Sequence, residues 1–182
     1  MIRNEALKLL QLHLSQDSLI KHSLATEAIM RALATRFSEN ADRWGLLGLL
    51  HDLDFESTKD NMALHGKKTV ELLGQTLDNV ERQAILSHNE MTGFVRASRL
   101  DHALAAAESV TGLIAATALI YPDKKLTSVK VSSVIKRMKQ PAFARAVSRE
   151  TIMECEKIGL TLDEFITLSI EAMKSVADDL GL

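Results

Sequence analysis

The stretch Trp44-Gly-Leu-Leu-Gly-Leu-Leu-His-Asp-Leu-Asp54 ends an apolar run with an adjacent imidazole and carboxylate, His51 and Asp52. Apolar runs of this kind are buried in folded proteins, and an ionisable group is costly to bury without a partner. A bound cation is one of the few partners that satisfies an imidazole and a carboxylate together. The stretch therefore predicts a metal site inside the core of the protein.

The apolar residues around this stretch recur at helical spacing, and we find no strand-like alternation. With 182 residues, 46% of them hydrophobic, and only two prolines, the chain suits one helical domain with a sizeable core. We therefore expect an all-α, single-domain helical bundle over residues 1–182, with the metal-site core in about 18–120 and the helices of 128–180 packed on it. Helices are expected over 2–14, 18–37, 41–53, 61–76, 78–90, 100–120, 128–139, 143–158 and 161–180, and a loop over 54–60.

Composition and local sequence patterns also indicate the cellular compartment of the protein. Its one cysteine, Cys155, excludes an internal disulfide framework and fits a reducing compartment. Residues 2–10 carry charges within an apolar stretch, so they are no secretory signal. Residues 103–121 approach the length of a membrane span, but they include Glu108 and several small residues that suit a buried helix. We expect a cytoplasmic protein without a membrane partner.

The charges are distributed unevenly along the chain. Residues 124–149 hold eight of the 22 Lys and Arg residues and none of the 24 Asp and Glu residues. Such a segment suits a phosphorylated ligand, a nucleic acid or a solvated basic surface. Its only aromatic residue is Phe143, so we do not expect nucleic acid as the partner. For a small phosphorylated substrate, the phosphate contacts would come from Lys136, Lys139, Arg145 and Arg149.

Four more residues of the types that bind metals fall on apolar helical faces: His22, His65, His88 and Glu108. A single histidine on an apolar face is usually a core residue whose ring nitrogens are hydrogen-bonded. Several such residues together with the His51-Asp52 pair favour a metal site. We expect the first metal to be held by His22, His51, Asp52 and Glu108. A second metal would be held by His65 and His88, with Asp52 bridging the pair. A mixed set of imidazoles and carboxylates suits the divalent cations of Mn, Fe, Co, Ni, Zn and Mg.

The order of these residues resembles the HD superfamily, which is named for its adjacent His-Asp pair. His65-Gly66 and Ser87-His88-Asn89-Glu90 match the places where two-metal members carry additional histidines. The segments at 48–56 and 107–114 are similar to a group of small bacterial HD proteins, and the resemblance covers about residues 18–150. It implies an all-α fold and hydrolysis of a phosphate ester, often a nucleotide, by a metal-bound water, with Asp52 as a catalytic residue.

The chain departs from that family at two places. The family usually has Asp where this chain has Glu108, and the extra methylene moves the carboxylate. Members that cleave cyclic dinucleotides have a histidine where Asn89 stands and a Gly-Tyr-Pro motif downstream, so we do not expect that activity. The alternative function is a non-catalytic HD-type module that senses a nucleotide or binds a partner. We expect His13 and His102 to be surface or structural residues, and Cys155 not to act as a nucleophile.

Overall fold

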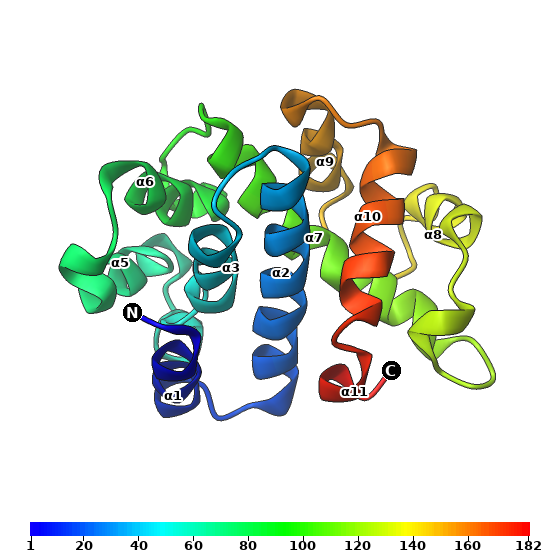
Figure 1. The fold of residues 1–182 in the computed structure, drawn as a ribbon, viewed down its shortest axis with the longest axis horizontal. Coiled ribbons are helices and arrows are strands. Elements are labelled where there is room, and N and C mark those ends of the chain that lie inside the picture. The colour runs from blue at the N-terminus through cyan, green and yellow to red at the C-terminus, as the bar shows by residue number, and fades with distance from the viewer.

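The computed structural model describes residues 1–182 and consists of helices without any strand (Figure 1). The predicted all-α fold class is confirmed. The longer helices are α1 (Arg3–His13), α2 (Asp17–Arg36), α3 (Ala41–Leu50), α5 (Lys67–Leu73), α6 (Asn79–His88), α7 (Arg99–Leu119), α8 (Val131–Met138) and α10 (Leu162–Lys174). Between and after them lie α4 (Phe55–Thr58), α9 (Arg149–Ile152), α11 (Ala177–Leu180), and the 3-10 helices η1 (Met62–Leu64), η2 (Gly74–Thr76), η3 (Glu90–Thr92), η4 (Leu126–Ser128) and η5 (Met153–Ile158).

Helix α7 lies at the centre of the bundle, and 15 of its 21 residues are buried. Figure 1 shows it crossing behind α2, and it also packs against α6, α9 and η5. By length and composition α7 could cross a membrane, but its apolar surface is covered by these neighbours. It begins with a capping box in which Ser98 Oγ accepts from the Asp101 N–H and the Asp101 carboxylate accepts from the Ser98 N–H. The buried central helix expected at 103–121 is therefore present.

Helices α2 and α3 pack against each other more extensively than any other pair of helices, and Gly48 permits their approach. A Cβ atom at Gly48 would lie 2.9 Å from the backbone oxygen of Thr26 on α2, which is too close for a carbon. Gly45 differs, because a Cβ there would meet only the flexible side chain of Arg31. Close packing of α2 on α3 matters for the expected metal site, because His22 lies in α2 and His51 directly follows the last residue of α3.

Four predicted elements differ in the structure. The helix expected over 61–76 breaks at His65 and Gly66, because Gly66 adopts a positive φ of 91° that ends one turn and starts the next. The loop expected over 54–60 contains the short helix α4. The helix expected over 143–158 begins only at Arg149 and continues as the 3-10 helix η5, because turns fill the preceding residues. The last expected helix is interrupted between α10 and α11.

We predict that Gly48→Ala lowers the free energy of unfolding by roughly 1–3 kcal/mol, the usual cost of overpacking a core. The cost arises because the methyl group would have to push the backbone of α2 away from α3. Gly45→Ala is the matched control on the same helix, and its cost should be smaller because only the side chain of Arg31 has to move and the backbone of α2 can stay in place. Urea unfolding of both variants measures the difference. Equal or smaller destabilisation by Gly48→Ala would contradict this account of the packing.

Candidate metal centre

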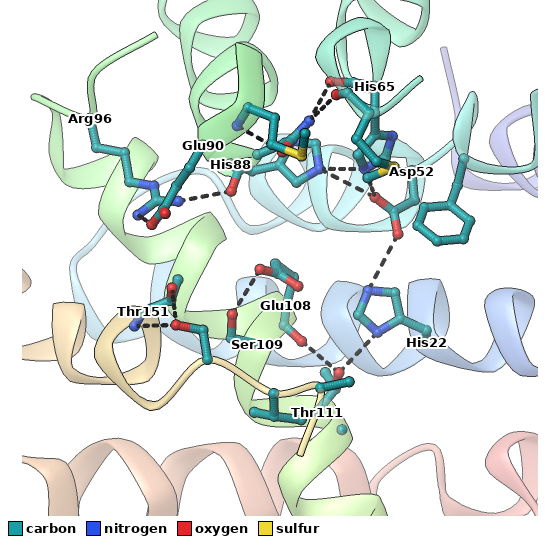
Figure 2. A pocket seen from close by; sticks show the side chains of 18 residues that line it. His22, Asp52, His65, His88, Glu90, Arg96, Glu108, Ser109, Thr111 and Thr151 are labelled. Carbon is teal, nitrogen blue, oxygen red and sulfur yellow. Dashed lines mark hydrogen bonds and ion pairs between the residues drawn. The ribbon is translucent and has the colours of Figure 1, made fainter. Parts of the chain in front are cut away.

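Four histidines from four different segments meet around Asp52. Figure 2 shows three of them, His22, His65 and His88, with Asp52. His22 lies in α2, and His51 follows the last residue of α3. His65 stands at the break before α5, and His88 is the last residue of α6. The sequence predicted all five residues as members of the site, and the structure brings them together.

The Asp52 carboxylate is the common neighbour of these imidazoles. Its Oδ1 lies 3.2 Å from Nε2 of His65, 3.3 Å from Nε2 of His88 and 3.3 Å from Nε2 of His51. Its Oδ2 lies 3.6 Å from Nε2 of His22. The nitrogen atoms also approach one another, at 3.3 Å between His22 and His51 and 3.1 Å between His65 and His88. Two groups result, His22–His51–Asp52 and Asp52–His65–His88, and both include Asp52.

The other ring nitrogen of every histidine is bound to a hydrogen-bond acceptor. His51 Nδ1 donates to the Gly48 carbonyl at 2.8 Å, and His88 Nδ1 donates to the carbonyl of Ile85. His65 Nδ1 donates to the Asp54 carboxylate at 2.7 Å. Because carbonyl and carboxylate oxygens can only accept, each of these Nδ1 atoms carries a proton.

His22 has the same arrangement through a hydroxyl group. Thr111 Oγ1 donates its hydrogen to the Glu108 carbonyl at 2.7 Å, so it accepts from His22 Nδ1 at 2.9 Å. In a neutral imidazole with a protonated Nδ1, Nε2 carries a lone pair. Four such lone pairs directed at one another and at a carboxylate repel unless a cation or a proton lies among them. The donor set therefore fits a divalent cation, and neutral imidazole nitrogen with carboxylate oxygen is a common ligand combination for one.

Asp54 is a functional residue that the sequence analysis missed. It is buried, and besides His65 it accepts from the backbone N–H groups of Gly66 at 2.8 Å and Thr69 at 3.0 Å. A carboxylate behind a metal-binding histidine fixes the ring orientation and strengthens the histidine as a ligand. Its signal in the sequence was its place two residues after Asp52, at the end of the same apolar run. Thr111 likewise orients His22, through its hydroxyl group.

A second missed residue, Arg96, holds the end of helix α6. Its Nε donates to the Ser87 carbonyl at 2.9 Å and its Nη2 to the His88 carbonyl at 2.8 Å. Its Nη1 binds the Glu154 carboxylate at 2.6 Å, and the other oxygen of Glu154 accepts from His102 Nδ1 at 2.7 Å. A guanidinium at a helix C-terminus satisfies carbonyls that have no partner within the helix. This network therefore ties the backbone of His88 to η5.

Glu108 lines the same pocket but belongs to neither close group of ligand atoms. Its carboxylate accepts from Ser109 Oγ at 2.8 Å, and Figure 2 shows it between Ser109 and His22. Burial raises the pKa of the Glu108 carboxyl group above its ordinary value. Its role as a metal ligand remains a prediction.

The four basic residues expected to contact phosphate do not line this pocket. The structure uses Arg149 differently, because its guanidinium donates to the backbone carbonyls of Gln140, Phe143, Ala144 and Val147. It thereby closes the turns before α9, where an unbroken helix was expected. Lys136, Lys139 and Arg145 are exposed on the surface. None of the four basic residues lies in the pocket.

The remaining candidate residues lie outside the centre. His102 is buried and structural through its bond to Glu154, as described above. His13 is the last residue of α1 and is half-buried. Burial raises the pKa of the Cys155 thiol to about 11, which opposes formation of the reactive thiolate.

The fold and the centre define a class: an all-α protein whose histidines and aspartate could hold a divalent metal. The chain matches the family model of the HD domain over residues 19–116, more than half of its length, and it belongs to that family. Family members are generally metal-dependent hydrolases. No curated protein and no solved structure matches the chain. All four clustered histidines and Asp52 lie within the matched residues.

We predict that the purified protein binds up to about two divalent cations per chain, because two ligand groups share one carboxylate. His88→Ala should lower the bound metal by about one cation, since the group of His22, His51 and Asp52 stays intact. Asp52→Ala should remove most metal from both groups. Elemental analysis after loading with Mn²⁺, Ni²⁺ or Zn²⁺ measures the stoichiometry, with His13→Ala as the matched control. Equal metal content in wild type, His88→Ala and Asp52→Ala would refute the assignment.

The stability of the metal-free protein should depend on pH through His65. Burial opposes protonation of His65, but hydrogen bonds to Asp52 and Asp54 outweigh it and raise its pKa from 6.5 to about 9. Because the folded-state pKa lies above the unfolded value, the resulting stabilisation is fully present below about pH 6.5 and is lost as the pH rises through about 9. The melting temperature of chelator-treated protein should fall across this range, and the fall should be smaller in His65→Gln. Superimposable pH profiles of the two proteins would contradict the prediction.

Proposed function

We propose that this protein is a metal-dependent phosphohydrolase that acts on a phosphate ester, nucleotides included. The observation that carries the proposal is the convergence of four imidazole Nε2 atoms on the Asp52 carboxylate, where Asp52 and three of the imidazoles, His22, His65 and His88, line a pocket of about 510 Å³. A buried structural cluster would have no need of such an opening. Membership of the HD family supports the same chemistry.

Each group in the pocket has a distinct part in the proposed reaction. A bound divalent cation supplies Lewis acidity toward a phosphoryl oxygen and lowers the pKa of a water molecule that it binds. Asp52 and the histidines would hold that cation, and their Nδ1 partners keep each ring in position. The side chain of His22 is 23% exposed, whereas those of His51, His65 and His88 are 0–5% exposed. His22 therefore marks the side from which the phosphate ester approaches.

The pocket offers little fixed positive charge for the phosphate. Arg96 is its only Lys or Arg, and that guanidinium is already bound to Glu154 and to backbone carbonyls. Asp52, Glu90 and Glu108 also line the pocket and contribute negative charge. Neutralisation of the phosphate therefore depends on the cations, and removal of the metal should abolish substrate binding as well as turnover.

The test is hydrolysis of a panel of phosphate esters by protein loaded with Mn²⁺, Mg²⁺, Ni²⁺ or Zn²⁺. We expect Asp52→Asn to lower kcat/KM by at least about 100-fold, because both ligand groups lose their shared carboxylate. Asp60→Asn, at an exposed residue eight positions further along the chain, is the matched control and should behave as wild type. Phosphate release that persists in Asp52→Asn, or is absent from wild type across the panel, would reject the proposal.

A non-catalytic nucleotide-sensing or partner-binding module is the second candidate function. The position of Glu108 favours it, because its carboxylate is bonded to Ser109 and stands apart from both ligand groups. If the protein is an enzyme in which Glu108 completes the metal site, Glu108→Asp should retain or raise hydrolysis and Glu108→Ala should abolish it. If it is a sensor, no variant shows turnover, yet a nucleotide raises the melting temperature of the wild type.

A further inference from the structure

A second cavity of about 430 Å³ adjoins the metal-site pocket. It lies among the first turns of α2, the second half of α7, and the segment from α10 to the residues after α11. His22, Thr111 and Gly112 line both cavities, so the two spaces meet at one common wall. A molecule bound at His22 could extend from one cavity into the other.

The second cavity is mainly apolar and offers no unpaired cation. Its apolar lining consists of Ala25, Ala115, Leu119, Met173, Leu180 and Leu182. Its only charged side chains are Asp17 and Lys21, and these pair with each other at 2.9 Å on the exposed first turns of α2. A second phosphate group would find no free positive charge here, whereas a hydrocarbon or aryl group would find an apolar surface.

Two details indicate that this space suits a ligand. Its volume falls in the ordinary range of small-molecule sites, about 300–1,000 Å³. Leu119, which lines it as the last residue of α7, is 54% exposed, although the other apolar residues of this helix are mostly buried.

We propose that the second cavity binds the organic group of the substrate, and that the substrate is a phosphate monoester of an apolar alcohol with a single phosphate. This inference rests on the proposed function. Hydrolysis of such an ester breaks the bond between phosphorus and the alcohol oxygen. Water supplies the oxygen that binds to phosphorus and the proton that the departing alcohol takes up. The phosphate occupies the metal-site pocket, and the alkyl or aryl part lies beyond His22 against α7.

The first experiment measures binding without turnover. Alkyl phosphonates from ethyl to octyl carry a carbon–phosphorus bond that hydrolysis does not cleave, and calorimetry gives their affinity for the metal-loaded protein. We expect affinity to rise by up to about fourfold for each methylene group buried. Ala115→Phe fills the cavity and should flatten this dependence on chain length. Ala32→Phe places the same ring at another half-buried alanine, on α2 outside both cavities, and should keep the wild-type dependence.

The second experiment measures hydrolysis of the corresponding alkyl phosphates, so that the two proposals can fail separately. Chain-length-dependent binding without hydrolysis would keep the cavity assignment and reject the enzyme. Hydrolysis whose kcat/KM is the same for ethyl and octyl phosphate, with equal phosphonate affinities, would keep the enzyme and overturn the cavity assignment. If Ala115→Phe does not fold, Leu119→Lys at the exposed end of α7 provides the same test, because a charge there opposes an apolar chain.

Discussion

The Asp52 carboxylate is the constraint on which the centre depends, because it is the one group near all four imidazoles. Each imidazole comes from a different segment, so the positions of these segments must agree within a few tenths of an ångström. Gly48 lets α3 approach α2, which sets the pair His22 and His51. The positive φ of Gly66 interrupts the helical conformation before α5, and this turn directs His65 toward Asp52. Backbone packing thus determines the ligand geometry.

Much of the fold and of the ligand set could be predicted from sequence for physical reasons. Helical periodicity identified α2, α3 and α7, because each buries a continuous apolar face. The same periodicity identified the candidate ligands, because they are polar residues on apolar helix faces. Such residues need a partner, since burial of an unpaired polar group is unfavourable. The break at Gly66 was missed because Gly tolerates both helical and positive φ values, and the surrounding residues keep a helical pattern.

The supporting residues could not be predicted in the same way. Asp54, Thr111 and Arg96 act through hydrogen bonds to specific partners that lie up to 89 residues away in the chain. Neither periodicity nor spacing carries information about such pairs. The basic segment, residues 124–149, was expected to contact phosphate because its sequence is rich in Lys and Arg. The direction of each of these side chains depends on local backbone geometry, which the sequence pattern does not give. Arg149 binds four backbone carbonyls because the turns before α9 leave them without helical partners.

Two regions of the chain contribute residues to the two cavities. The residues matched by the HD family, 19–116, contain every member of the two ligand groups. Residues beyond them supply Val147 and Ser148 to the metal-site pocket and Met173 and Leu180 to the second cavity. Glu154, also beyond them, binds the arginine that holds His88. In the proposed function, the second cavity is lined both by residues of the matched region and by the C-terminal helices, so a change at Met173 or Leu180 would alter which alcohol fits while the ligand geometry around Asp52 is preserved.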